Sequence, residues 1–340
     1  METVRLDLDN AVDLVAQKLV ASGTSESNAY SVAQALVAAE ADGQAGHGLS
    51  RVASYAAQAR SGKVDGRATP VVSRPALALL RIDANSGFAY PAVDLACEEL
   101  PAVARKTGIA AACIHNSHHF GQAGAHAERL ARQGLVALVF SNSPKAMSFW
   151  GGDKPMLGTN PIAMAAPLEG ADPLVIDLAL SRVARGKIAA AKRDGQRIPD
   201  NWALDADGRP TDDPAAALEG SMLPIGDAKG AALALVVELL AAALTGSNFG
   251  YEASSFFEGD GPPPHIGHTI IVFEPKIASG NGFAERMTNI MSAIDATKGA
   301  RLPGVSRLSR RRQAETHGIE VSTTLYEEIV AGAQTGPDHA

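Results

Sequence analysis

The sequence has few of the features that mark secreted, membrane-bound or disulfide-rich proteins. Only two cysteines occur among 340 residues, Cys97 and Cys113, and both lie in apolar surroundings. We therefore expect buried free thiols and a reducing compartment. No apolar run reaches the ~18 residues that a membrane span needs, and the N-terminus lacks the basic and apolar regions of a signal peptide. These absences predict a cytoplasmic protein with no membrane partner.

Positive charge is also scarce, since the formal net charge is −7. A protein that holds nucleic acid through its phosphates needs an excess of Lys and Arg, so this class is excluded. The one arginine cluster, residues 307–312, is typical of a solvated helix face or an ion-pair surface. Four histidines fall between residues 115 and 126 without a carboxylate or thiolate nearby in the sequence, so we predict no metal site.

The chain contains an alternation of helices and short apolar strands. Periodic apolar residues predict helices at 10–23, from 25 or 27 onward, 49–60, 122–133, 228–244, 278–298 and 326–331. Short apolar runs predict strands at 77–82, 109–114, 135–141, 162–166, 174–178 and 269–273. Residues 247–265 are rich in Gly and Pro. This composition predicts a long loop, which is a candidate lid. The pattern indicates an α/β (α+β mixed) protein.

Two common catalytic frameworks are missing. No G-x-G-x-x-G follows any predicted strand, so a nicotinamide cofactor would need a scaffold other than the doubly wound dinucleotide fold. G-x-S-x-G is absent and neither cysteine has a polar setting, which argues against nucleophilic hydrolysis. Acid–base chemistry with a bound cofactor remains.

The most informative stretch is residues 116–122, Asn-Ser-His-His-Phe-Gly-Gln. It places two adjacent histidines between a predicted strand and a predicted helix. Backbone N–H groups at the start of a helix can receive a phosphate. This junction is therefore our first candidate for a functional site.

Five motifs in order along the chain resemble those of the malate/L-lactate dehydrogenase-like family of NAD(P)-dependent oxidoreductases. They lie at residues 42–51, 116–121, 158–163, 176–187 and 301–304. Within this family the chain looks closest to the Δ1-piperideine-2-carboxylate/Δ1-pyrroline-2-carboxylate reductases. The resemblance implies a homodimer with a non-Rossmann cofactor-binding sheet in residues 76–284. It also implies a helical N-terminal part, residues 1–75, that packs with a helical C-terminal part, residues 285–340.

The resemblance also implies roles for individual residues. His47 matches the proton donor, Arg51 the group that holds the substrate carboxylate, and Thr159 a substrate contact. The alternatives are a structural turn histidine, a surface arginine and a turn that exists only for its shape. The matching cofactor-binding positions are His119, Phe120, Gly121, Gln122, Ala123, Asp177, Leu178, Ala179, Lys229, Arg301, Pro303 and Gly304. The basic residues Arg182, Arg185 and Lys187 favour NADPH, with NADH as the alternative.

The chain departs from the family pattern at two positions. Gly46 stands where many members have serine, and Lys187 stands where the reductases have an acidic residue, so both expected partners of His47 are missing. An imine can arrive already protonated, so it depends less on a positioned proton donor than a ketone does. We therefore predict reduction of a cyclic imino acid to L-proline or L-pipecolate. The alternatives are an L-2-hydroxyacid dehydrogenase of the malate, lactate or ureidoglycolate type, and a non-catalytic nucleotide-binding relative.

Overall fold

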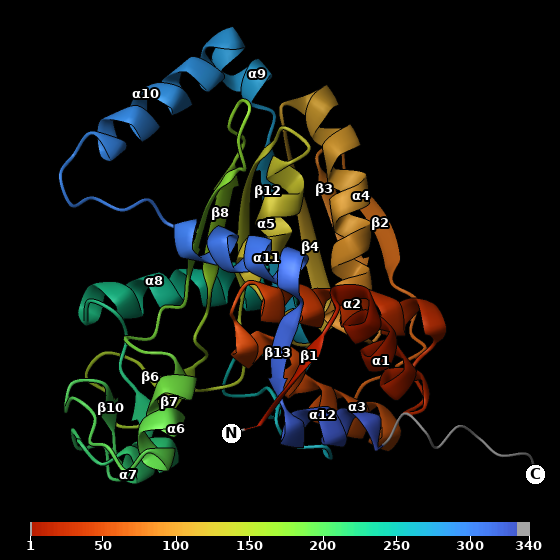
Figure 1. The fold of residues 1–340 in the computed structure, drawn as a ribbon. Helices are drawn as coiled ribbons and strands as arrows, with labels where there is room; N and C mark the ends of the chain where they lie inside the picture. The colour runs from red at the N-terminus through yellow and green to blue at the C-terminus, as the bar shows by residue number, and fades with distance from the viewer. Residues whose placement is uncertain (1, 332–340) are drawn as a thin grey trace, which may run out of the picture.

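A seven-stranded sheet forms the centre of the computed structural model, which describes residues 2–331 (Figure 1). Its strands, in spatial order, are β2 (Val71–Ala76), β3 (Leu79–Asp83), β4 (Ile109–Ser117), β12 (Ile266–Phe273), β5 (Val136–Ser141), β8 (Ile162–Ala166) and β9 (Leu174–Leu178). Only the β3–β4 pair is parallel. This largely antiparallel sheet confirms the prediction of a mixed α/β protein without the doubly wound fold.

Both faces of this sheet are covered. Side chains alternate along a strand, so Ala137 and Val139 of β5 face the opposite side from Leu138 and Phe140. The first pair packs with α4 (Ala89–Thr107) and α5 (Ala123–Ala131). The second pair packs with residues of α8 (Ala228–Glu238) and its continuation η3 (Leu239–Ala243). Figure 1 shows α4 and α5 next to each other along one face.

A second apolar core joins the two ends of the described chain. Its helices are α1 (Leu8–Val20), α2 (Glu26–Ala41), α3 (Val52–Ser61), α11 (Val305–His317) and α12 (Thr323–Val330). Leu36 and Tyr55 from the beginning of the chain share this core with Ile319 and Ile329 from its end. The strands β1 (Thr3–Leu6) and β13 (Ile319–Ser322) pair antiparallel beside it.

A third core lies between the central sheet, α8 with η3, and a small lobe at the lower left of Figure 1. The lobe contains a four-stranded sheet and two helices, namely β10 (Ala203–Leu204), β11 (Ser221–Met222), β6 (Met147–Ser148), β7 (Pro155–Leu157), α6 (Arg185–Arg193) and α7 (Pro214–Glu219). No pattern in the sequence predicted this four-stranded sheet. Strands of two or three residues are too short to show an apolar period.

Most of the predicted helices are present with shifted ends. The first begins at Leu8 because Asp7, rather than Asn10, caps it by accepting from the Asp9 and Asn10 amides. The helix predicted for 278–298 is interrupted by η4 (Gly280–Gly282), so it forms α9 (Pro275–Ser279) and α10 (Phe283–Asp295). Gly280 has a φ of 61°, a left-handed conformation that stops the first helix.

Helix α10 has no buried residue, and it stands away from the sheet in Figure 1.

Within residues 2–331, no helix has both the length and the apolar character needed to cross a bilayer.

Candidate active site

The His47 turn is built by two short 3-10 helices between α2 and α3. These are η1 (Ala45–His47) and η2 (Leu49–Arg51). The Glu40 carboxylate at the end of α2 accepts a hydrogen bond of 2.9 Å from the Leu49 amide, which fixes the second turn. A Cβ atom at Gly48 would lie 2.2 Å from that carboxylate. Only glycine therefore fits beside Glu40, and the half-buried His47 is held at the edge of the helical core.

His47 belongs to a chain of hydrogen-bonding groups that crosses three elements. Its Nδ1 atom lies 3.2 Å from Nε2 of His119, and the two rings stack with centroids 5.3 Å apart. The Nδ1 atom of His119 lies 2.6 Å from the hydroxyl of Tyr55, on the buried face of α3. The Tyr55 hydroxyl lies 3.3 Å from that of Tyr90 on α4. His119, predicted as a cofactor-loop residue, is thus the direct partner of His47.

The electrostatic surroundings keep these hydrogen-bonded side chains neutral. Burial, and then the positive charge of Arg51, lower the pKa of His47 to about 4. The same two causes lower the pKa of His119 well below its usual range. Burial raises the pKa of Tyr55 to about 12. At neutral pH both imidazoles and the phenol are uncharged, so the hydrogen bonds between them fix tautomers.

Tyr55 was not among the candidate residues from the sequence. It occupies an inward position of an amphipathic helix, where an aromatic residue is ordinarily part of the core. No local signal distinguishes it, because its partner His119 is 64 residues away in the chain.

Arg51 lies one helical turn after His47. Its Nε atom donates to the Gly46 carbonyl at 2.7 Å. Its Nη1 atom is buried and has no hydrogen-bond partner among residues 2–331. Its guanidinium carbon lies 4.5 Å from the ring centroid of Phe257. A carboxylate oxygen is the kind of acceptor that would satisfy the free Nη1 atom.

His118 points to a different environment from that of its neighbour. It is 1% exposed, and neither ring nitrogen has a partner among the described residues. Its ring is packed by the aromatic rings of Tyr55, Phe88 and Phe256 at centroid distances of 5.3–5.9 Å. The two adjacent histidines therefore have unequal positions, and only His119 contacts His47.

The rest of the predicted cofactor loop is held rigidly. Phe120 is buried and stacks on the ring of His268 in β12, with centroids 4.5 Å apart. Gly121 has a φ of 72°, and a Cβ atom there would lie 2.7 Å from the Tyr90 hydroxyl. Gln122 occupies the N-cap position of α5 without a side-chain capping bond, and Ala123 is the first residue of the helix. Glycine is needed at position 121 because the Tyr90 side chain fills the space that a Cβ atom would take.

A second group of predicted cofactor residues lies at the end of β9. The Asp177 carboxylate accepts a hydrogen bond of 2.8 Å from the Gly124 amide in the first turn of α5. Burial raises the pKa of this carboxyl. Leu178 and Ala179 follow it with exposed side chains. The structure thus brings the end of β9 against the start of α5.

The late loop reaches the same strand. Gly304 has a φ of 84°, and a Cβ atom there would lie 3.4 Å from the Val175 carbonyl of β9. Arg301 and Pro303, earlier in the loop, are exposed. Lys229 is exposed in the first turn of α8. Neither cation makes a hydrogen bond to another side chain or backbone group within residues 2–331.

Thr159 lies in a turn with a defined backbone. Its amide donates to the Ser143 hydroxyl at 3.1 Å, and its carbonyl accepts from the Leu180 amide at 2.8 Å. Asn160, the next residue, has a φ of 41°, a left-handed conformation that asparagine tolerates better than most residues. The Thr159 side chain remains partly exposed.

A buried carboxylate holds this turn. Glu238 of α8 is 2% exposed and accepts hydrogen bonds from the amides of Asn160 and Asn142 and from the backbone of Gly250. Burial raises the pKa of Glu238. The residue was not predicted as part of the site, because a single Glu in an apolar helix gives no indication of three distant partners.

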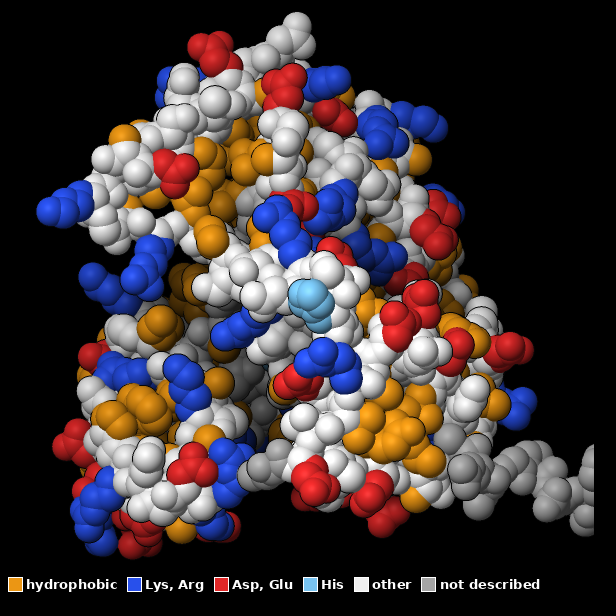
Figure 2. All heavy atoms as spheres, viewed as in Figure 1, with side chains coloured by type: hydrophobic (Ala, Val, Ile, Leu, Met, Phe, Trp, Pro, Cys, Tyr) orange, Lys and Arg blue, Asp and Glu red, His pale blue; other side chains and the backbone are white. Residues whose placement is uncertain are grey.

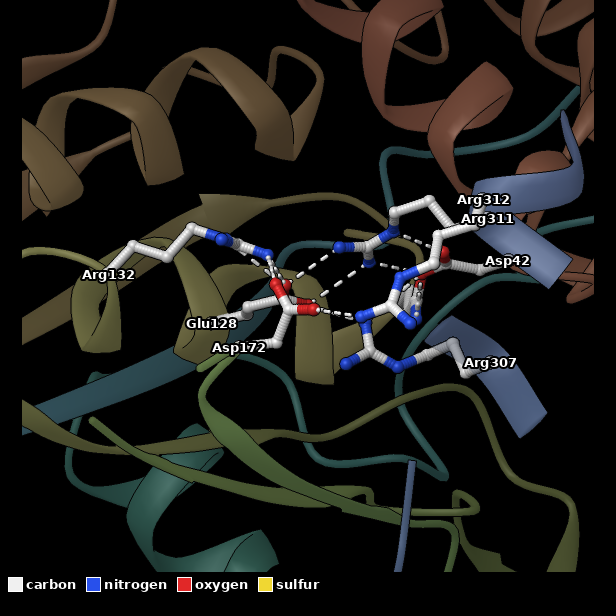
Figure 3. A network of polar contacts seen from close by, with 8 residues as sticks. Asp42, Glu128, Arg132, Asp172, Arg307, Arg311 and Arg312 are labelled. Atoms are coloured by element: carbon white, nitrogen blue, oxygen red, sulfur yellow. Dashed lines mark hydrogen bonds and ion pairs between the residues drawn. The ribbon is translucent and has the colours of Figure 1, made fainter. Parts of the chain in front are cut away.

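Of the two predictions for the arginine cluster, ion pairing is confirmed, and a solvated helix face is wrong for Arg307. Arg307 is only 9% exposed, and with Arg311 it forms ion pairs to Asp42 and Glu128 (Figure 3). Asp42 is 1% exposed and also accepts a hydrogen bond of 2.9 Å from Gln122. The network joins α2, α5 and α11 behind the predicted cofactor loop. In the space-filling view, charged side chains of both signs gather over α11 (Figure 2).

The described residues contain no group of three or more His, Cys, Asp or Glu side chains that could hold a metal ion. A groove of about 470 Å³ lies between α2, α4, α5 and α11 and is lined by Phe120 and Gln122. His47 and Arg51 do not line this groove, so the groove does not mark the position of the candidate catalytic residues.

Comparison with known proteins identifies the family. A model of the malate/L-lactate dehydrogenase family matches residues 6–330. The chain is 50% identical to the (2R)-3-sulfolactate dehydrogenase (NADP(+)) of Chromohalobacter salexigens, over 96% of this chain and 98% of the relative. It is 45% identical to a Δ1-pyrroline-2-carboxylate/Δ1-piperideine-2-carboxylate reductase of Pseudomonas putida, over 88% of each chain.

Solved structures agree with this result. The crystal structure of Δ1-piperideine-2-carboxylate reductase from Pseudomonas syringae superposes with a TM-score of 0.92 at 38% identity, over 97% of this chain and all of the other. Sulfolactate dehydrogenase from Methanocaldococcus jannaschii gives a TM-score of 0.90 at 28% identity, over 97% and 96% of the two chains. The chain therefore belongs to the malate/L-lactate dehydrogenase family, and it is an oxidoreductase.

Proposed function

We propose that this protein uses NADPH to reduce the C2 atom of a cyclic imino acid, Δ1-pyrroline-2-carboxylate or Δ1-piperideine-2-carboxylate, to L-proline or L-pipecolate. The observation that carries the proposal is the pairing of a neutral imidazole, His47, with a buried N–H of Arg51 that has no partner within residues 2–331. The pair offers one site for a carboxylate and one for the group attached to C2. Several relatives that are 36–45% identical are named as reductases of these imines.

Arg51 is the proposed carboxylate ligand. Its Nε atom is already bound to the Gly46 carbonyl, which orients the guanidinium. The free Nη1 atom then gives a charge-assisted hydrogen bond to one carboxylate oxygen. We propose that Thr159, partly exposed in its rigid turn, contacts the same substrate.

The residues around the start of α5 fit a dinucleotide. The φ of 72° at Gly121 lets the loop turn into α5, and the Nη2 atom of Arg307 is buried without a partner among the described residues. The proposed cofactor ligands are the predicted set, in which Asp177 and Gly304 bring β9 and the late loop to the same place. When bound, the nicotinamide supplies the hydride.

His47 suits a substrate that needs little acid catalysis. With a pKa of about 4 its imidazole is uncharged at neutral pH, so it is a weak proton donor. A protonated imine carries its own proton, and hydride addition leaves a neutral amine. In this reaction His47 orients the ring nitrogen, and His119 and Tyr55 hold the His47 ring. His119 therefore takes the orienting role that Gly46 and Lys187 cannot supply.

The second candidate is an NADP-dependent 2-hydroxyacid dehydrogenase acting on 3-sulfolactate or a related hydroxyacid. It is supported by the relative that is 50% identical. A neutral His47 is in the protonation state that accepts a hydroxyl proton during oxidation. This candidate needs a second cation for the sulfonate, and Lys145 and Lys187 are exposed residues that could supply it.

The test is a side-by-side assay of NADPH consumption, followed by nicotinamide absorbance. The substrates are the two cyclic imines, pyruvate, oxaloacetate and 3-sulfopyruvate. Fast reduction of an imine supports the first candidate, and a preference for a keto acid supports the second. His47→Asn should bind NADPH normally, by fluorescence titration, while imine turnover falls by at least about tenfold, because the group that orients the ring nitrogen is lost; this is less than the about 10²–10⁴-fold contributed by a group that transfers the proton itself. No turnover of any substrate would favour a binding-only relative.

We further propose a homodimer in which α10 packs on a second copy. Phe283, Met287, Ile290, Met291 and Ile294 recur at helix spacing, yet none is buried. An apolar stripe of this kind ordinarily packs against another surface. Light scattering after size exclusion should give twice the mass of the chain, and Ile290→Glu should give the monomer mass. A monomeric wild type would contradict the proposal.

A further inference from the structure

A buried lysine holds one loop against the active site. Lys63 is 2% exposed, and its ammonium donates to the carbonyls of Ser255, Glu258 and Asp260 at 2.7, 3.1 and 3.0 Å. Three acceptors match the three donors of an ammonium group. A buried charge is stable only when it is fully paired in this way.

Other groups tie down the same loop. The Gln58 side-chain amide, fully buried on α3, donates to the carbonyls of Phe256 and Glu258, both at 2.9 Å. The Ser61 hydroxyl donates to the Gly259 carbonyl at 2.6 Å. Residues 255–260 are therefore a fixed wall attached to α3, and not the lid that the Gly and Pro content suggested.

This wall presents two aromatic rings to the catalytic residues. Phe256 is 6% exposed and lies against the rings of His118 and His119, with centroids 5.3 and 5.1 Å away. Phe257 is 64% exposed, and its ring lies beneath the Arg51 guanidinium at 4.5 Å. The ring covers one side of the cation and also faces open space.

We propose that Phe257 determines substrate selectivity at Arg51, and that Lys63 is the positioning residue that holds it there. The proposal rests on the proposed role of Arg51. The guanidinium donates in its own plane, and its Nε atom is taken by the Gly46 carbonyl, so the Nη1 atom offers a place for one anionic group while the ring covers one face. The part of the substrate beyond this anionic group lies against the Phe257 ring, which favours a hydrocarbon. A second anionic group placed on it would lose hydration without gaining a partner. The site therefore selects ring-shaped monocarboxylates over dianions.

The test uses unreactive ligands, so that it does not depend on turnover. Calorimetry with NADPH-saturated protein compares pyrrole-2-carboxylate, a flat ring monocarboxylate, with malonate, a small dianion. Wild type should bind pyrrole-2-carboxylate more tightly. Phe257→Ala should weaken that binding at least tenfold and change malonate binding less than threefold. Phe257→Leu, which keeps an apolar side chain, should retain most of the preference.

Lys63→Met tests the positioning role. It should reduce the ligand preference as Phe257→Ala does, because the loop is released, whereas a purely structural lysine would lower the melting temperature without changing the preference. Lys106→Met, at an exposed position near the end of α4, is the matched control. Equal loss of both ligands in Phe257→Ala, or a wild type that prefers malonate, would overturn the proposal. Tight binding of pyrrole-2-carboxylate without imine turnover would instead contradict the proposed function.

Discussion

The Nδ1 atom of His47 lies 3.2 Å from the Nε2 atom of His119, and their rings are nearly parallel at 14°. The two residues come from the turn after α2 and the loop before α5, so the contact joins the helical core to the central sheet. Because Tyr55 binds the other nitrogen of His119, the proton on either histidine depends on the same hydroxyl. The orientation of the proposed catalytic imidazole therefore depends on tertiary contacts between distant segments of the sequence.

Tyr55→Phe should impair catalysis without affecting cofactor binding. The change removes the hydroxyl that fixes the His119 tautomer and keeps the buried ring. We expect kcat to fall by about tenfold, a fraction of what a direct acid–base group contributes, and the pH profile of kcat/KM to change shape. The affinity for NADPH should stay the same.

The control is Tyr30→Phe. It removes an exposed hydroxyl on α2 that donates a hydrogen bond to Asp13 of α1. Steady-state kinetics from pH 5 to 9 for both variants make the comparison. If the two variants keep the same kcat and pH profile, Tyr55 does not act through His119.

The glycines on either side of His47 should respond differently to alanine. In Gly48→Ala the new methyl group would collide with the Glu40 carboxylate, which also holds the Leu49 amide. The His47 turn must shift, and we expect kcat/KM to fall by at least tenfold. Gly46→Ala is the matched control, because no atom lies within 4 Å of its Cβ position. A fully active Gly48→Ala would show that the turn geometry does not matter for catalysis.

Local sequence signals predicted the parts of the site that come from turns. The glycine-rich turn at 42–48 and the strand-to-helix junction at 116–122 have distinctive composition, and both lie in the site. His119 was predicted as a cofactor-loop residue, and its contact with His47 was not predicted. Its contact to His47 joins residues that are 72 positions apart, and no period or spacing encodes that separation.

Buried charged residues were the least predictable. Lys63, Glu238 and Arg307 have side chains that are ordinarily exposed, and in the sequence they look like surface residues. Each is buried because partners from distant segments satisfy it. The Lys63 partners begin 192 residues later, for example. Partners of this kind can be found only when the fold is known.

The buried ion-pair network should be important for stability. Asp42→Ala leaves Arg307 and Arg311 without one of their two carboxylates and Gln122 without its acceptor. Breaking a buried pair from one side ordinarily costs about 3–5 kcal/mol, because the remaining charge is uncompensated. We expect a loss of this size in the free energy of unfolding, measured by urea titration.

The surface pair Arg5–Glu320 provides the comparison. Its side chains are 62% and 57% exposed, so Glu320→Ala should cost at most about 1 kcal/mol. Similar losses in Asp42→Ala and Glu320→Ala would mean that the buried network adds nothing beyond ordinary surface charge pairing.

Stability should fall in mild acid because several histidines are buried in neutral form. Burial lowers the pKa of His268 to about 3, of His126 to about 4 and of His118 to about 3. In the unfolded chain these groups titrate near 6.5, so below that pH the unfolded state binds more protons. Their contribution is complete above pH 6.5 and is lost as the pH falls towards 3–4. Glu128 stays ionised across this range, since hydrogen bonds from Arg311 and Arg307 outweigh the effect of burial and lower its pKa to about 2.

His268→Gln isolates one of these groups. The histidine lies between the hydroxyls of Ser141 and Ser117, and glutamine supplies a donor and an acceptor in the same space without titrating. Each buried neutral histidine adds up to about 1.4 kcal/mol per pH unit to the slope of unfolding free energy against pH. The variant should therefore start less stable at pH 7.5, yet show a slope between pH 6 and 5 that is smaller by about this amount. Urea unfolding at pH 7.5, 6 and 5 measures both quantities. An unchanged slope would mean that His268 titrates equally in the folded and unfolded states, and it would contradict the prediction that burial keeps this ring neutral.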